Sequence, residues 1–140
     1  MRSSNEHDSL VLEHVNLSVL DLEDRIRFFL TAFPQFRVRG CSAGASTPRW
    51  AHVGTDTQYI AIEEAQSGAA RRKRGESGFN HAGFVVSDAQ ALRERMLGAG
   101  FREGYVVVVP AYPHRRREYF LDADGNEFEF VQHERNAYES

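Results

Sequence analysis

The sequence predicts an α+β protein made of two βαβββ modules. The main observation is a near-repeat: His14 and His81, 67 positions apart, are each followed by four residues, a valine, one residue and an aspartate. Each copy is an alternating run of β-forming residues that passes into a helical pattern. Three further strand patterns follow each helix, so the two halves agree in the order of their elements as well as in the repeat.

The length and composition fit a single globular domain. At 140 residues, with 41% hydrophobic and 26% charged residues, the chain can bury a core of its own. We expect the domain to span residues 10–133, with modules at 10–65 and 79–133, a linker at 66–78, and polar tails at 1–9 and 134–140. The linker contains a basic run at 71–74, for which a solvated loop is a simpler interpretation than a phosphate or nucleic-acid site.

Composition also argues against several classes of protein. A net charge of −3 gives no support for nucleic-acid binding. No apolar run approaches the ~20 residues that a membrane span requires, and residues 1–9 lack an apolar signal core. The single cysteine, Cys41, rules out an intrachain disulfide. We therefore expect a cytoplasmic protein with no membrane partner.

The elements of the first module follow from local patterns. Alternation over 10–20 predicts a strand that has His14 on one face and Leu17 on the other. Asp21 is the expected N-cap of a helix that ends at Pro34. The apolar stripe of this helix is Ile26, Phe29, Leu30 and Phe33. A strand at 36–41 and a hairpin of strands at 49–54 and 58–64 complete the module.

The second module repeats this order. A strand at 79–86 leads to a helix for which Ser87 and Gln90 form the expected capping box. Leu92, Met96 and Ala99 make its apolar stripe, and Gly98 and Gly100 end it. Strands are expected at 105–109, 117–121 and 127–132. The Asp-Gly pair at 124–125 favours a tight turn between the last two.

Three residues on the first and last strands suggest a metal site. In the last strand Phe128 and Phe130 face the core, so Glu129 lies on the opposite face, as His14 and His81 do in their strands. Two imidazoles and one carboxylate form a facial triad, which suits a divalent first-row metal such as Fe, Mn, Zn or Ni and leaves coordination positions open. The simpler alternative is that the repeat is only architectural.

The two repeated units, their first-strand histidines and the closing segment 122–129 (Asp-Ala-Asp-Gly-Asn-Glu-Phe-Glu) strongly resemble the vicinal oxygen chelate superfamily. It includes glyoxalase I, extradiol dioxygenases, fosfomycin-resistance thiol transferases and bleomycin-resistance proteins. The resemblance implies curved mixed sheets around a metal cup with the helices outside, and commonly a homodimer. It places His14, His81 and Glu129 at the metal positions.

The resemblance has one gap. Members like glyoxalase I have a fourth protein ligand in the last strand of the first unit, where this chain has Ala61. The three-ligand pattern is therefore closer to extradiol dioxygenases and fosfomycin transferases. Glu63, two residues along the same face, is the first candidate for a catalytic base, although a surface glutamate is an equal alternative. Tyr119 matches the position of an active-site tyrosine in extradiol enzymes, and packing is its simpler interpretation.

The expected partner is a small, oxygen-rich substrate. Trp50, Tyr59 and Tyr105 are candidates for stacking on it, and Arg115 and Arg117, in the basic segment 112–117, for binding an anionic group. The leading hypothesis is a metal-dependent dioxygenase, lyase, isomerase or thiol transferase. The alternatives are a metal-free protein that sequesters a drug or another small molecule in the same cleft, and an accessory domain that has lost activity.

Overall fold

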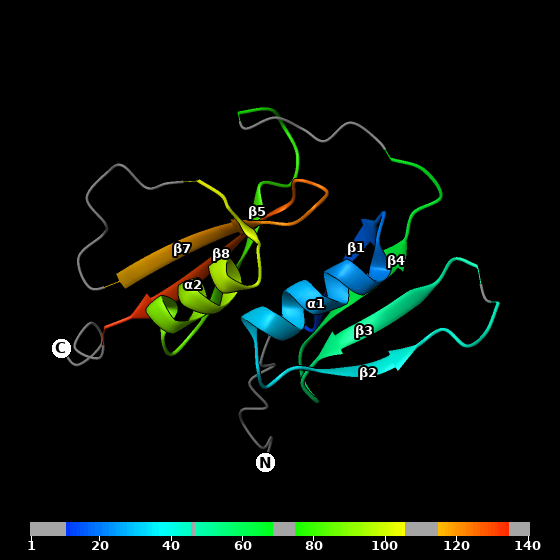
Figure 1. The fold of residues 1–140 in the computed structure, drawn as a ribbon, viewed down its shortest axis with the longest axis horizontal. Coiled ribbons are helices and arrows are strands. Elements are labelled where there is room, and N and C mark those ends of the chain that lie inside the picture. The colour runs from blue at the N-terminus through cyan, green and yellow to red at the C-terminus, as the bar shows by residue number, and fades with distance from the viewer. Residues whose placement is uncertain (1–10, 46, 69–74, 106–114, 135–140) are drawn as a thin grey trace, which may run out of the picture.

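The computed structural model describes residues 11–45, 47–68, 75–105 and 115–134, and two equivalent halves make up its fold. The first half contains β1 (His14–Val19), α1 (Leu22–Ala32), β2 (Arg37–Cys41), β3 (Trp50–Gly54) and β4 (Tyr59–Glu64). The second contains β5 (His81–Val85), α2 (Ala89–Gly98), β6 (Arg102–Glu103), β7 (Arg115–Leu121) and β8 (Glu127–His133). The predicted α+β fold with two βαβββ modules is confirmed (Figure 1).

Each module forms one four-stranded mixed sheet. The strand orders are β1-β4-β3-β2 and β5-β8-β7-β6. In each sheet the first strand lies parallel to the last, and the other neighbours are antiparallel. The two predicted hairpins, β3–β4 and β7–β8, are confirmed. The first strand of each module, β1 or β5, is therefore an edge strand of its own sheet.

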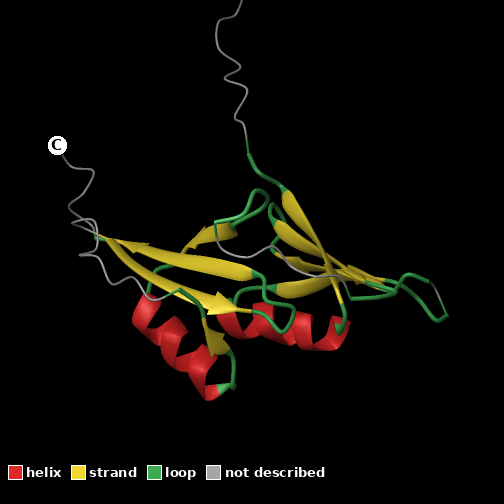
Figure 2. Cartoon of the chain, turned by 90° about the horizontal axis from the view of Figure 1, so that it is seen from above, coloured by secondary structure: helices red, strands yellow, loops and turns green. Residues whose placement is uncertain are grey.

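The helices and the sheets form two layers. Figure 2 shows both helices on one side of the molecule, with the two sheets on the other. We call the sheet face that turns away from the helices the open face. Alternation places Leu17 and Val19 toward the helices, where they are buried, and leaves His14, Asn16 and Ser18 on the open face.

Helix α1 packs against both modules, which the sequence pattern did not predict. The predicted stripe is confirmed for Phe29 and Phe33, which are buried. Arg25, Phe28 and Ala32 are fully or almost fully buried as well, so two sides of this helix are covered. On the second module, the rings of Phe29 and Phe128 lie 5.2 Å apart, and those of Phe33 and Phe84 lie 5.0 Å apart. A single aromatic core therefore joins the modules.

A buried ion pair makes the same connection. The guanidinium of Arg25, on α1, donates to Asp122 and, at 3.0 Å, to Asp124 in the β7–β8 turn. The side chains of Arg25 and Asp122 are fully buried, and that of Asp124 is 6% exposed. Burial raises the pKa of Asp122, against the opposing effects of the Arg25 charge and of hydrogen bonds from Asn126.

Local predictions in the second module need three corrections. Asp88, not Ser87, caps α2, because its carboxylate accepts a hydrogen bond from the Ala91 N–H at 2.9 Å. The edge strand β6 ends at Glu103, before the strand predicted at 105–109. Tyr105 follows β6, and 106–109 lie outside the described residues. Strand β7 includes the predicted 117–121 but begins two residues earlier, at Arg115, and 112–114 are not described.

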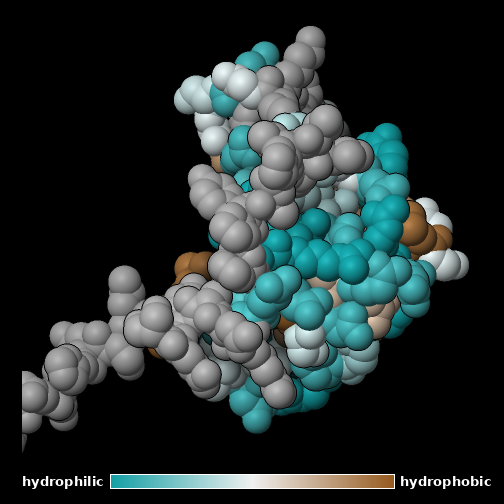
Figure 3. Space-filling view, turned by 90° about the vertical axis from the view of Figure 1, so that its left-hand side faces the viewer, coloured by the Kyte–Doolittle hydropathy of each residue, from teal (hydrophilic) through white to brown (hydrophobic). Residues whose placement is uncertain are grey.

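The outer side of the second module is mostly hydrophilic in its described part (Figure 3). Across the described residues, the structure contains no helix with the length and apolar character of a membrane span.

Candidate functional site

On the open face of the second sheet, a histidine and a carboxylate lie in contact. His81 begins β5, and Glu129 lies on the adjacent β8, where it pairs with Gly83. The Nε2 atom of His81 is 2.9 Å from Oε2 of Glu129. The Nδ1 atom of the same ring is 2.7 Å from Oδ1 of Asn80. Both ring nitrogens thus face side-chain oxygen atoms.

Tyr119 completes this cluster from β7. It pairs with Glu129 across the β7–β8 ladder, and its ring meets that of His81 edge-on at 5.7 Å. Burial raises the pKa of Tyr119, and the negative charge of Glu129 and a hydrogen bond to it raise it further. Its hydroxyl therefore keeps its proton at neutral pH and donates to Glu129. Tyr105 packs edge-on against Tyr119 at 6.0 Å.

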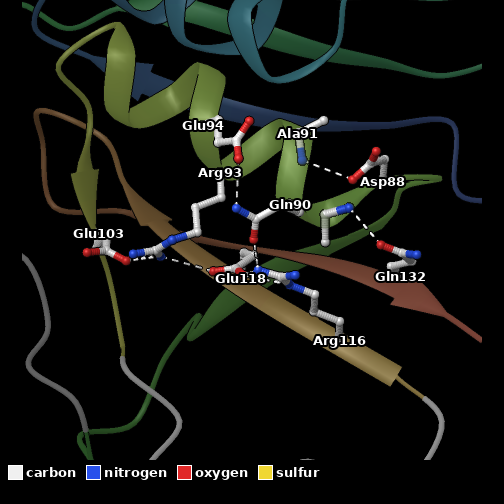
Figure 4. A network of polar contacts seen from close by, with 10 residues as sticks. Asp88, Gln90, Ala91, Arg93, Glu94, Glu103, Arg116, Glu118 and Gln132 are labelled. Atoms are coloured by element: carbon white, nitrogen blue, oxygen red, sulfur yellow. Dashed lines mark hydrogen bonds and ion pairs between the residues drawn. The ribbon is translucent and has the colours of Figure 1, made fainter.

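The arginines of β7 divide between the two faces of the sheet. Arg117 lies on the open face, with its Nε 4.0 Å from Oε1 of Glu129, and alternation places Arg115 on the same face. Arg116 points the other way and donates to Gln90 of α2 (Figure 4).

The contacts of Arg116 belong to a network that fastens α2 to the sheet. Arg116 and Arg93 both donate to Glu118, whose side chain is 12% exposed, and Arg93 also binds Glu103 of β6 (Figure 4). This network lies on the helix side, so it positions α2 and is separate from the candidate site.

The open face of the first sheet has an aromatic cluster. His14 and Tyr59, which pair across β1 and β4, stack at 4.8 Å with an interplanar angle of 17°. The rings of Tyr59 and His52 lie 4.6 Å apart, and those of His52 and Trp50 lie 4.8 Å apart. The Arg39 guanidinium covers the Tyr59 ring at 4.3 Å. Burial lowers the pKa of His52, and the Arg39 charge lowers it further.

Glu13 accepts hydrogen bonds from two members of this cluster. Its Oε1 accepts a hydrogen bond from Nδ1 of His14 at 2.8 Å and another from the Tyr59 hydroxyl at 3.2 Å. These bonds, the one from His14 first, lower the pKa of Glu13. Burial, and then the Glu13 charge, raise the pKa of Tyr59. Tyr59 therefore stacks on His14 and binds the same Glu13 oxygen as His14 does.

The predicted site residues fall into two groups within one chain. His14, Trp50, Tyr59 and Glu63 lie on the first sheet, as does Ala61, which is buried. His81, Arg115, Arg117, Tyr119 and Glu129 lie on the second, with Tyr105 beside them. Among the described residues, no three His, Cys, Asp or Glu side chains converge as metal ligands. His14 therefore does not join His81 and Glu129 in a single chain.

A hollow of about 440 Å³ separates the two edge strands β1 and β5. Apolar side chains make up most of its lining, among them Leu12, Val15, Phe33, Phe36, Phe84 and Val85. His14 and Glu13 also line it. Leu12 and Val85 are 75% and 73% exposed, which leaves apolar surface uncovered along both edges.

The donors present suit a divalent metal. An imidazole nitrogen and a carboxylate oxygen already lie within contact distance at His81 and Glu129, and the second nitrogen of that imidazole has an oxygen partner. Metal-binding histidines characteristically have such a partner on their other nitrogen. His81 and Glu129 would hold the metal, and a third donor must come from elsewhere.

Sequence reasoning missed Glu13 and Asn80. Both directly precede a histidine of the repeat, so the offset of 67 applies to them as well. Their equivalent positions in the repeat were the signal that could have identified them, although glutamate and asparagine are different residue types.

The sequence model of the Glyoxalase/Bleomycin resistance protein/Dioxygenase superfamily matches residues 11–130. The chain belongs to this superfamily. A comparison with curated protein sequences gives no match.

Solved structures of the superfamily share the fold. A glyoxylase/bleomycin resistance protein/dioxygenase domain from Frankia sp. EAN1pec is 22% identical, with 91% of this chain and 94% of that chain covered and a TM-score of 0.72. The fosfomycin resistance protein FosX from Mesorhizobium loti is 27% identical, with coverages of 86% and 89% and a TM-score of 0.63. FosX from Listeria monocytogenes, complexed with Mn(II) and sulfate, is 22% identical, with coverages of 89% and 92% and a TM-score of 0.64.

Proposed function

We propose that this protein is a divalent-metal-dependent enzyme that acts on a small substrate through two of its adjacent oxygen atoms. The observation that carries the proposal is the contact between His81 and Glu129, with the second nitrogen of His81 held by Asn80. A histidine and a carboxylate placed in this way on an open sheet face form two thirds of a facial triad. The complex of the Listeria FosX with Mn(II) gives a precedent within the fold.

We propose that His14 of a second copy supplies the third ligand. His14 lies on an edge strand, is 44% exposed, and has no part in a three-residue cluster within the described chain. The edges β1 and β5 both leave apolar side chains uncovered, among them Leu12 and Val85. A symmetric dimer that pairs β1 of one chain with β5 of the other would cover these edges and bring His14 to His81 and Glu129 twice.

The side chains around the pair indicate how a substrate would be handled. A bound metal would act as a Lewis acid and stabilise negative charge on a substrate oxygen. The Tyr119 hydroxyl keeps its proton and can donate it to, or share it with, that oxygen. Arg117 and Arg115 would bind an anionic group of the substrate. Glu63, brought by the second copy together with His14, is the candidate base.

Metal analysis tests the proposal. The protein is purified with Mn²⁺ present, desalted, and measured for bound metal beside His81→Ala and His52→Ala. We expect stoichiometric metal in the wild type, a loss in His81→Ala, and no change in His52→Ala, because the His52 ring contacts Trp50 and Tyr59 and none of the proposed ligands. Metal that stays bound in His81→Ala would refute the proposed site.

One observation favours a second candidate function, the metal-free binding of an aromatic or cationic molecule. Trp50, His52, Tyr59 and His14 form a continuous series of rings on the open face, and Trp50 is 37% exposed. Such a surface can stack on a planar ligand. If the wild type binds no metal but is stabilised by an aromatic cation, and Trp50→Ala removes that stabilisation, this second function replaces the first.

A further inference from the structure

The residues that precede the two histidines of the repeat have the same contact. Glu13 Oε1 lies 2.8 Å from Nδ1 of His14, and Asn80 Oδ1 lies 2.7 Å from Nδ1 of His81. In both cases a side-chain oxygen meets the same ring atom at equivalent positions of the two modules. The two modules thus share this contact to the histidine Nδ1 as well as the order of their elements.

This contact depends on where the strands begin. Neighbouring residues within a strand point to opposite faces, so two consecutive side chains in a strand do not normally meet. Strands β1 and β5 begin at His14 and His81, so Glu13 and Asn80 directly precede the first paired residue, although the Glu13 carbonyl still accepts from the Tyr59 N–H. Their side chains are therefore free to turn toward the ring that follows.

The contact also decides which ring nitrogen carries the proton. A carboxylate only accepts hydrogen bonds, so Nδ1 of His14 must be the donor. With the proton on Nδ1, the neutral ring has its lone pair on Nε2. The stacked Tyr59 ring, whose hydroxyl binds the same Glu13 oxygen, limits rotation of the imidazole. At His81, Oδ1 of Asn80 faces Nδ1, but Nε2 lies 2.9 Å from the Glu129 carboxylate, which only accepts. In the metal-free protein Glu129 therefore favours a proton on Nε2 of His81, and a bound metal would take the place of that proton.

We propose that Glu13 and Asn80 are positioning residues for the two histidines. Glu13 holds the proton on Nδ1 of His14, and Asn80 accepts the proton on Nδ1 of His81 once a metal replaces the Nε2 proton that faces Glu129, so that both rings present Nε2 to the metal. The role of Asn80 and the metal-binding half of this inference rest on the proposed function, whereas the control of the His14 proton by Glu13 does not. Asn80 is uncharged, so Glu13 is the member that adds negative charge to the site. Glu13 therefore makes His14 the more electron-rich of the two imidazole donors.

The first test reads the proton position in metal-free protein. Long-range ¹H–¹⁵N NMR at a pH where the histidines are neutral distinguishes the two tautomers of His14. We expect the Nδ1–H form in the wild type and in Glu13→Gln, whose amide oxygen can still accept, and a shift toward the Nε2–H form in Glu13→Ala. His81, which lies on the other sheet, serves as the internal reference and should not change in the Glu13 variants. A His14 tautomer that is the same in Glu13→Ala and the wild type would overturn the inference.

The second test reads the metal. Free Mn²⁺ is followed by electron paramagnetic resonance during titration of the wild type, Glu13→Ala, Asn80→Ala and Glu13→Gln. We expect the two alanine variants to bind Mn²⁺ roughly 10- to 100-fold more weakly, as is typical when the partner of a ligating histidine is removed, with Glu13→Gln in between. Unchanged affinity in both alanine variants would overturn the metal-binding half. If the wild type binds no Mn²⁺ while Glu13→Ala still shifts the tautomer, the proposed function fails and the control of the proton by Glu13 stands.

Discussion

At the scale of single residues, the neighbours of each candidate side chain set its protonation. Tyr119 lies in a buried, negatively charged environment and keeps its proton. Glu13 accepts two hydrogen bonds and stays ionised at neutral pH. His52 lies among rings and beside an arginine, so it stays neutral. The two sheets thus offer different groups: a protonated phenol beside the Glu129 carboxylate on the second, and the neutral His52 ring and the Glu13 carboxylate on the first.

His52 gives a direct test of this electrostatic description. Its pKa should lie below about 6.5, the ordinary value for histidine, because burial and the Arg39 charge both disfavour the imidazolium. Arg39→Gln should raise it part of the way, whereas Arg37→Gln, which removes a partner of Asp56, should leave it unchanged. NMR titration of the ring protons measures all three. Since the pKa is lower in the folded state, the contribution of His52 to stability is complete above that ordinary value and is lost as the pH falls through the folded-state pKa.

The faces of the site residues could be predicted from sequence, but their partners could not. Alternation placed His14 and Glu129 opposite the buried Leu17 and Phe128, because one apolar face must cover the helices. The contacts of Glu13 depend on the exact first residue of β1, and alternation does not determine strand ends. For the same reason β7 begins at Arg115, two residues before the strand predicted at 117–121.

At the scale of elements, the helix N-caps show that two neighbouring residues can both suit the capping position. Asp21 was predicted as the cap of α1 and is confirmed, with its Oδ1 2.9 Å from the Asp24 N–H. At α2, two neighbouring residues, Ser87 and Asp88, can both cap, and the pattern Ser87–Gln90 favoured the first. The structure uses Asp88, and Gln90 instead contacts Glu94 and Arg116.

Replacing these two residues should separate their contributions to stability. Asp88→Ala leaves the Ala91 N–H, in the first turn of α2, without its acceptor and should lower the free energy of unfolding by about 1 kcal/mol. Ser87→Ala, one position away and also exposed, should have no effect. Urea denaturation of both variants gives the comparison. A larger loss in Ser87→Ala than in Asp88→Ala would mean that the helix begins one residue earlier than the structure shows.

At the scale of the whole molecule, the packing of the two modules against each other was the feature hardest to predict from the sequence. Each module was predicted correctly in outline from its own periodicity, since strand and helix patterns are local. The docking of α1 on the second module depends on contacts between residues about 100 positions apart, such as Arg25 and Asp122. Because the buried residue Arg25 is charged, a search for apolar periodicity does not identify the side of α1 on which it lies. As a result, the sequence predicted three converging ligands, and the structure divides them between two sheets.

The buried ion pair should be essential for the stability of this arrangement. Arg25→Ala leaves Asp122 and Asp124 buried without their cation, and breaking such a pair costs about 3–5 kcal/mol. Arg37→Ala, which removes an exposed pair with Asp56, should leave the urea midpoint unchanged. Double replacement of Arg25 and Asp122 by apolar residues should recover part of the loss, because no unpaired charge then remains at position 122. An Arg25→Ala variant as stable as the wild type would show that solvent reaches the two aspartates.

The division of ligands between two sheets can be tested by mixing subunits. His14→Ala and His81→Ala should each lack metal as separate proteins, because every site loses one ligand. When the two variants are unfolded, mixed in equal amounts and refolded together, half of the dimers contain one chain of each kind. In these mixed dimers the intact His14 of one chain meets the intact His81 and Glu129 of the other, so about a quarter of the wild-type metal content should return. A site formed within one chain would give no recovery, since no chain in the mixture has all three ligands.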